Sequence, residues 1–389
     1  MNADAKNNYD ATHITVLHGW EAIRKRPGMY VGSTGERGLH HSVFEVVGWA
    51  VNEVLAGRAK SVDVTLRPDG GVSVAEDGPG ATVEPAGDND GPSLEALLTR
   101  IHDWTRPIGR DVAAVNSAVL GPSVTNALSK CLTAEVRRDG TSRLQEYRRG
   151  VAVAPPAVLG PAAGNGTTIT FWSDPDIFET VECSFAVLED RLRELAFLNR
   201  SLDISLTDAR PAGELRSRRF RFPDGARDFV AILDASAGEP VHPDVIGFEH
   251  EVPQMEGTVE VALRWSTSRD ERIRGFVNSW PTPCGGTHVA GFREGASFAV
   301  NAYARARRLL TASEPDLSFD QISEGLTAVV SVKLDRPELE GATRRMLGNA
   351  AVRTHVAEAV SERLGRWLEE QPDQAAAVVG RMIRNARRI

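Results

Sequence analysis

Three side chains near the start of the sequence stand at helical spacing and could do chemistry together. Glu45, Trp49 and Asn52 lie at positions i, i+4 and i+7 of the segment LHHSVFEVVGWAVNEVL. If this segment is a helix, the three side chains share one face and look into one pocket. A carboxylate in a pocket can act as a general base, and an indole provides a flat apolar wall. Glu45 is therefore the first candidate catalytic residue.

Two adjacent histidines in the same segment, His40 and His41, suggest a metal site at first sight. Adjacent side chains in a helix point about 100° apart, and the sequence places no third ligand near them. We therefore predict no metal site here.

The elements that must position these residues can be predicted from apolar periodicity and turn residues. Residues 39–55 repeat apolar side chains at helical intervals without an interior proline, which predicts a helix. Alternating valines on both sides of Pro-Asp-Gly-Gly predict a β-hairpin over residues 60–76. Residues 82–121 are rich in Gly, Pro, Asp and Ala, which predicts a surface loop or lid around one short helix. A strand at 167–172 and a helix at 185–199 follow.

A second strand-rich unit begins near Arg219 and closes with long helices, so the boundary between two units falls within 209–224. The length of 389 residues suits two domains. The formal charge of -8 argues against nucleic acid as a partner. The three cysteines lie far apart, which indicates a reducing compartment. Without an apolar run of about 20 residues or a signal-type segment, we expect a cytoplasmic protein that does not bind membranes.

Three stretches of the sequence resemble the bacterial DNA gyrase B family. They are ITVLHGWEAIRKRPGMYVGSTGERGLHHSVFEVV near the start, GGTHVAGFR at 285–293 and SEGLTAVVSVKL at 323–334. The resemblance covers the ATPase region of that family. It implies an α/β (α+β) fold: a Bergerat-type GHKL α/β sandwich in residues 1–219, followed by a ribosomal-protein-like transducer domain in residues 220–389. It also implies a degenerate stand-alone paralogue that lacks the cleavage domain and is not a functional topoisomerase.

The resemblance implies that helix 39–55 carries ATPase residues, one of which has changed. Glu45 matches the general base of the family and is retained. Trp49 stands where the family has the asparagine that ligates Mg²⁺. An indole has one N–H donor and no acceptor oxygen, so it cannot ligate magnesium. We therefore expect no metal and no cofactor.

The nucleotide motifs of the family have also changed. The adenine motif Asp-x-Gly-x-Gly reads EDGPG at 76–80, so Glu76 replaces the aspartate and Pro79 replaces an arginine. The extra methylene of Glu76 shifts its carboxylate. The glycine-rich phosphate loop aligns with residues 115–121, of which only Gly121 is kept. Side chains with a Cβ prevent the close approach of backbone to phosphate. The transducer loop that normally sends Gln and Lys to the γ-phosphate reads GATR at 341–344.

Several residues of the family's pocket are retained, which predicts that a cleft persists. Trp49, together with Trp104 from the altered lid, makes this cleft apolar and aromatic, as suits an organic ligand. The predicted ligand-binding residues are Val46, Trp49, Asn52, Val74, Glu76, Pro79, Trp104, Arg138, Thr167 and Ile169.

Three functions remain open. The leading hypothesis is a cofactor-independent cyclase of the Diels–Alder or pericyclase type in natural-product biosynthesis, because ring closure requires mainly shape, desolvation and one hydrogen bond. The alternative is a non-catalytic protein that binds an antibiotic or regulates gyrase. A residual gyrase-type ATPase is the third, although Trp49 and the altered loop argue against it.

The expected partner is a small organic molecule. The family dimerises through an N-terminal arm, and Tyr9 matches the arm tyrosine that reaches the partner's site, so a monomer and a homodimer both remain open.

Overall fold

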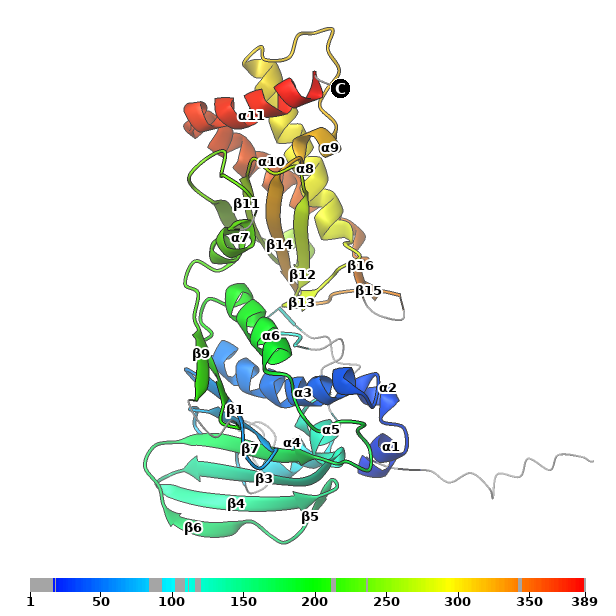
Figure 1. Ribbon diagram of the computed structural model, residues 1–389, viewed down its shortest axis with the longest axis vertical. Coiled ribbons are helices and arrows are strands. Elements are labelled where there is room, and N and C mark those ends of the chain that lie inside the picture. Colours follow the sequence, from blue (N-terminus) through cyan, green and yellow to red (C-terminus); the bar gives the residue numbers. More distant parts are fainter. Residues whose placement is uncertain are drawn as a thin grey trace, which may run out of the picture.

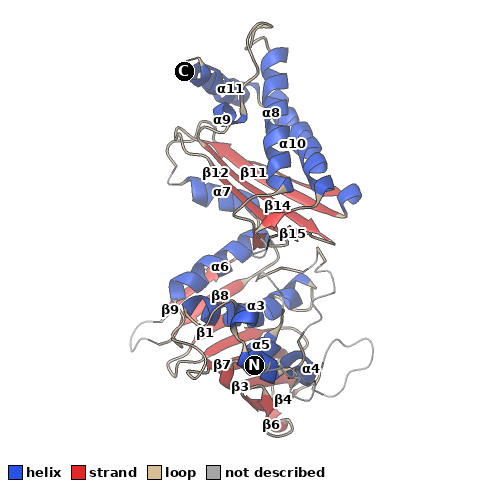
Figure 2. Cartoon of the chain, turned by 90° about the vertical axis from the view of Figure 1, so that its right-hand side faces the viewer, coloured by secondary structure: helices blue, strands red, loops and turns tan. Residues whose placement is uncertain are grey.

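The computed structural model describes residues 17, 19–83, 93–101, 109–110, 112–115, 120–210, 215–235, 237–341 and 345–387. Two sheets with helices packed on them lie end to end and give the molecule an elongated shape (Figure 1 and Figure 2). Tyr9, Trp104, and the altered positions within 116–119 and 342–344 lie outside the described residues.

The first sheet has nine strands within the described residues. Its order is β5-β4-β3-β7-β2-β1-β8-β9, and β6 pairs with β4. The elements of this part are α1 (Trp20–Lys25), α2 (Gly28–Val31), α3 (Glu36–Leu55), β1 (Val62–Leu66), β2 (Val72–Glu76), α4 (Leu94–Thr99), α5 (Pro122–Ala127), β3 (Ser129–Arg138), β4 (Thr141–Arg148), β5 (Val151–Ala152), β6 (Ala157–Pro161), β7 (Gly166–Ser173), α6 (Phe185–Leu198), β8 (Ile204–Asp208) and β9 (Arg216–Phe220).

Helix α3 packs its apolar stripe on this sheet. Leu39, Val43, Val46 and Val47 are fully buried in the first hydrophobic core, as expected of residues repeated at helical spacing. The predicted helix is confirmed and begins three residues earlier, at Glu36. The predicted hairpin is also confirmed, because β1 and β2 pair antiparallel.

The second sheet has the order β10-β11-β14-β12-β13. Strands β12 and β14 are parallel neighbours, and the chain between them includes α8, so they form a βαβ unit. The elements are α7 (Ala226–Asp234), β10 (Ile246–Val252), a 3₁₀ turn η2 (Pro253–Met255), β11 (Gly257–Trp265), β12 (Arg272–Val277), β13 (Trp280–Pro281), α8 (Thr287–Ala306), α9 (Phe319–Ile322), β14 (Leu326–Leu334), β15 (Leu339–Glu340), β16 (Met346–Leu347), α10 (Ala350–Glu370) and α11 (Pro372–Ala386).

Both faces of the second sheet are covered. Val261 and Leu263 of β11 join the core that α8, α10 and α11 close, whereas Ala262 between them joins a core with α7. Alternation of this kind follows from the two-residue period of a strand. The second of these cores also contains Phe197 from α6, so a helix of the first unit packs on the second sheet.

The junction between the two units is aromatic. The ring of Phe197 stacks on Phe222 with centroids 3.8 Å apart and on Phe229 with centroids 4.6 Å apart. Phe220 of β9 still pairs with Ile204 of the first sheet. The boundary predicted after residue 219 therefore lies one residue before the last strand of the first sheet ends.

Within the described residues, no helix is both long enough and apolar enough to cross a membrane.

Candidate functional site

Helix α3 holds both ends of the segment that leads into α5. Oε2 of Glu45 accepts hydrogen bonds from the backbone N–H groups of Leu120 at 2.9 Å and Gly121 at 2.7 Å. Oδ1 of Asn52 accepts one from the N–H of Ala113 at 2.9 Å. Glu45 is only 2% exposed. The shared helix face predicted from the spacing thus meets one segment of chain, and its polar groups bond to backbone amides there.

Trp49 lies on α3 one turn after Glu45, where the resemblance implies a magnesium ligand. Its ring is half-buried and packs against the first core. An indole offers one N–H donor and no acceptor oxygen. The side chain at this position therefore does not fit Mg²⁺.

The register of β2 against β7 brings four of the predicted residues together. Val74 lies opposite Ile169, and Glu76 lies opposite Thr167. Val74, Thr167 and Ile169 are fully buried, and Glu76 is 4% exposed. A buried carboxyl therefore sits at the end of a pair of strands whose valine and isoleucine face the core.

The carboxyl group of Glu76 accepts a hydrogen bond within its own turn. Its Oε2 accepts a hydrogen bond from the N–H of Gly78, so the longer side chain folds back on the motif. The hydroxyl of Thr167 accepts a hydrogen bond from the N–H of Ala81 at 2.9 Å. Burial raises the pKa of Glu76, although the hydrogen bonds from Gly78 and Thr167 oppose the shift.

The buried carboxyl leads to a pH-dependent prediction for the substitution Glu76→Gln. Because the pKa of Glu76 is raised, the native state binds more protons than the unfolded state just above the ordinary glutamate pKa. Wild-type stability should therefore fall in this range as the pH rises, whereas glutamine does not titrate. Between pH 4 and pH 7, the free energy of unfolding of the wild type should therefore decrease relative to that of the variant. Urea unfolding of both proteins across this range measures the difference, and a constant difference would contradict it.

Arg138 lies beside the same turn. Its Nη1 donates to the carbonyl oxygen of Gly80 at 3.1 Å. Gly80 has φ +81°, and a Cβ there would lie 2.7 Å from the carbonyl oxygen of Arg137, so only glycine fits. Pro79 is exposed, and Val46 is fully buried in the first core.

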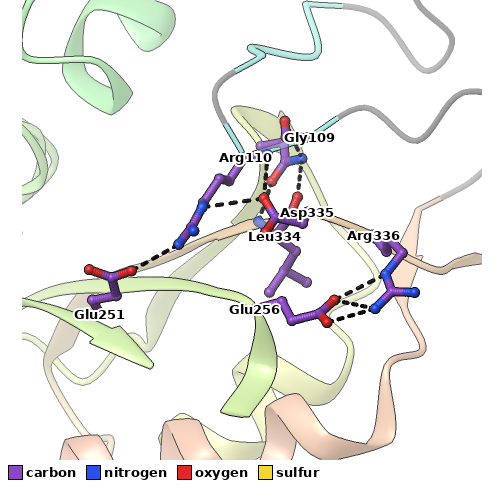
Figure 3. A network of polar contacts seen from close by, with 8 residues as sticks. Gly109, Arg110, Glu251, Glu256, Leu334, Asp335 and Arg336 are labelled. Atoms are coloured by element: carbon purple, nitrogen blue, oxygen red, sulfur yellow. Dashed lines mark hydrogen bonds and ion pairs between the residues drawn. The ribbon is translucent and has the colours of Figure 1, made fainter. Parts of the chain in front are cut away.

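Gly109 and Arg110 contact the second sheet (Figure 3), and residues 113–114 bond to both units. Arg110 forms ion pairs with Glu251 at 3.1 Å and with Asp335 at 3.3 Å. The carbonyl oxygen of Asn278 accepts the N–H of Ala114 at 2.7 Å. Ala113, next to Ala114, is the residue held by α3, so adjacent residues bond to the two units.

Arg191 of α6 also connects the first unit to the second, a role that the sequence did not predict. Its Nη2 donates to the carbonyl oxygens of Ala114 at 3.1 Å, Val115 at 3.2 Å and Ser279 at 2.9 Å. Its Nη1 pairs with Glu194 one turn later. In sequence, Arg191 is one charged residue of an amphipathic helix. The three carbonyls that it binds come from segments far away in the chain.

Comparisons with known proteins agree with this architecture. A family model described as DNA gyrase B matches residues 225–388. The DNA gyrase B protein of Streptomyces coelicolor is 43% identical over 99% of this chain, and the chain spans 58% of the length of that relative.

Two solved structures are similar as well. The 43K ATPase domain of Thermus thermophilus gyrase B, solved in complex with an aminocoumarin, has a TM-score of 0.79 and 33% identity, with 94% of each chain covered. The topoisomerase IV ATP-binding domain of Francisella tularensis, in complex with a small-molecule inhibitor, has a TM-score of 0.75 and 26% identity, with 96% of this chain and 98% of that chain covered.

These matches confirm the predicted fold, a GHKL-type α/β domain followed by a transducer domain. The chain therefore belongs to the DNA gyrase B family and corresponds to the ATPase region of that family.

Proposed function

We propose that this chain is a gyrase B-like protein that binds a small organic molecule in the cleft beside α3 and does not hydrolyse ATP. The observation that carries the proposal is the state of Glu45. Its carboxylate binds the N–H groups of Leu120 and Gly121, which belong to the segment that aligns with the family's phosphate loop. The carboxylate of Glu45 therefore already accepts the hydrogen bonds that these two amides would otherwise donate to a phosphate group.

A bound triphosphate would meet two obstacles at this place. It would have to displace Glu45 from its amides or lie beside a buried negative charge, which repels phosphate. It would also lack a neighbouring oxygen ligand for its magnesium ion, because Trp49 occupies that position. Both obstacles arise from the charges of the triphosphate and its magnesium ion, so an uncharged or weakly charged organic ligand avoids them.

The retained residues favour a ligand with an apolar body and one polar end. The half-buried ring of Trp49 is the apolar side chain that such a ligand would contact. Val74 and Ile169 form a buried apolar pair across β2 and β7, and Thr167 and Glu76 supply polar side chains at the end of the same register. Arg138 adds a cation at the adjoining turn. Pockets with mostly apolar walls and a few polar groups are typical of sites for drug-sized ligands.

The aminocoumarin complex of the Thermus relative makes novobiocin, an aminocoumarin, the first ligand to test. We expect titration calorimetry to show one equivalent of novobiocin bound, whereas ATP with magnesium gives no heat of binding. Arg138→Ala should weaken novobiocin binding about tenfold or more, because a hydrogen bond to a charged group is worth about 1.5–3 kcal/mol.

The matched control is Arg148→Ala, since Arg148 is an exposed arginine of the neighbouring strand that pairs with Glu146. This variant should bind novobiocin as the wild type does. Tight binding of magnesium ATP, with novobiocin excluded, would contradict the proposal and favour the ATPase.

The cyclase hypothesis is the catalytic form of the same proposal. With Oε2 of Glu45 committed to two N–H donors, the geometry favours a ring closure driven by shape and desolvation over one that needs Glu45 as a base. The chain should then accelerate cyclisation of a polyene ligand that binds the cleft, and Glu45→Gln should retain most of that rate. A ligand released unchanged after long incubation would leave binding alone as the function.

A further inference from the structure

We infer that the chain has a second small-molecule site, at the junction of its two units, which takes a small organic anion with an aromatic body. A cavity of about 670 Å³ lies between α2, α3 and α6 of the first unit and Trp280 and Pro281 of the second. This volume is in the range of sites for drug-sized ligands. Val115 and Leu120, near the two ends of the segment that aligns with the phosphate loop, line it on one side, whereas Glu45, Trp49, Asn52 and the predicted ligand-binding residues on β2, β3 and β7 do not.

The walls of the cavity are aromatic and come from three elements. Tyr30 of α2, Phe44 of α3 and Trp280 of β13 all line it. The guanidinium of Arg191 lies 5.7 Å from the Trp280 ring centroid, and the hydrogen bonds of Arg191 described above hold it in place. The indole of Trp280 therefore packs against the guanidinium of Arg191, which is held in one position. Flat, rigid walls of this kind suit a flat ring system, which stacks on them at little cost in conformational entropy.

The mouth of the cavity exposes apolar side chains to water. Met29 is 69% exposed and Val187 is 42% exposed, and both belong to the lining. Burying them under a ligand would gain about 25 cal/mol for each Å² of apolar area covered. The polarizable thioether of Met29 adapts to ligands of different shape.

The charges around the cavity favour an anionic group on the ligand. Arg37 is exposed and lines the cavity, and its charge acts on the neighbouring His41. Burial lowers the pKa of His41, a backbone hydrogen bond with Val31 opposes this shift, and the charge of Arg37 lowers the pKa further. Glu36 is also exposed and lines the cavity, so the lining carries one carboxylate against the two guanidinium groups of Arg37 and Arg191. Nε2 of His40 accepts the N–H of Ser184 at 2.8 Å. Arg37 is thus the cation that a ligand anion would meet at the mouth.

The fluorescent probe 1-anilinonaphthalene-8-sulfonate tests the site, since it joins an aromatic body to one negative charge. Its uncharged relative N-phenyl-1-naphthylamine is the matched control ligand. The full chain should bind one equivalent of the anionic probe. Arg37→Gln should weaken this binding about three- to fivefold, the upper range for an exposed ion pair, whereas Glu36→Gln, one residue away, should not weaken it. The uncharged probe should bind both variants equally.

A second variant tests the location of the site without disturbing the core. Val187→Trp places a large ring at the exposed mouth and should abolish binding of both probes, with an unchanged melting temperature as the check on folding. Unchanged binding of the anionic probe to Val187→Trp and Arg37→Gln would overturn the inference. Displacement of the probe by novobiocin would also overturn it, since the two sites would then be one. Displacement by a peptide of residues 1–16 would assign the cavity to a segment of the chain instead. An active ATPase would refute the proposed function and leave this site standing.

Discussion

Release of phosphate from magnesium ATP by this chain should be the same before and after the substitution Glu45→Gln. In a working gyrase-type site the carboxylate acts on water, and its removal should abolish turnover. Here the carboxylate accepts two backbone N–H groups, and an indole stands where the family resemblance implies the metal ligand. Losing one electrostatic contact to a transition state typically costs a factor of about 10²–10³ in kcat. If both the metal ligand and the phosphate amides are lost, as the proposed function requires, the remaining rate should fall below the limit of a coupled phosphate-release assay.

The Thermus thermophilus 43K domain, assayed in parallel, serves as the positive control for the ATPase assay. Turnover by the wild-type chain that disappears in Glu45→Gln would refute the loss of ATP hydrolysis. In that case Glu45 would have to leave the amides of Leu120 and Gly121 when nucleotide binds.

Replacing Arg191 with methionine should lower the free energy of unfolding by about 3 kcal/mol. Methionine fills much of the same volume, so the main loss is polar. Three backbone carbonyls lose their donor, and Glu194 is left with the longer ion pair to Arg274 at 3.6 Å. Breaking a buried ion pair by removing one partner typically costs about 3–5 kcal/mol. We expect the low end of this range, because Arg274 compensates part of the charge. Urea unfolding measures the change.

Arg193→Met on the same helix is the matched control. Arg193 pairs with Asp190 at the surface, and exposed pairs of this type contribute about 0–1 kcal/mol. Equal losses in the two variants would show that Arg191 stabilises α6 alone. A loss confined to Arg191→Met, together with faster proteolysis between the two units, would assign the effect to the junction.

Much of the fold could be predicted because the signals are local. The helix over 39–55 and the hairpin around Asp69 follow from periodicity and turn residues, and both are found. The predicted strand at 167–172 is β7 and the predicted helix at 185–199 is α6, each within a residue or two at its ends. These elements repeat one period over their whole length, so a short window of sequence suffices.

The site could be predicted only in part. Spacing predicts that Glu45 and Asn52 share one face of α3 and look into one pocket. In the structure both side chains accept hydrogen bonds from the backbone amides of residues 113, 120 and 121, partners that spacing could not give. An amide is present at nearly every residue, so its position depends on the folded path of the chain and not on residue type. The role of Arg191 cannot be predicted from the sequence for the same reason, because its partners are backbone carbonyl oxygens.

The turn at Asn278 and Ser279 has a consequence for attempts to split this protein. Both residues have positive φ and are almost fully buried, and their polar groups bond to Ala114 and Arg191 across the junction. A half-protein ending near Phe220 would expose the Phe197 ring to water and would aggregate through this apolar surface. Two such halves produced in one cell should associate through the contacts of this turn. The junction is therefore a suitable place at which to divide the chain for a split-protein reporter.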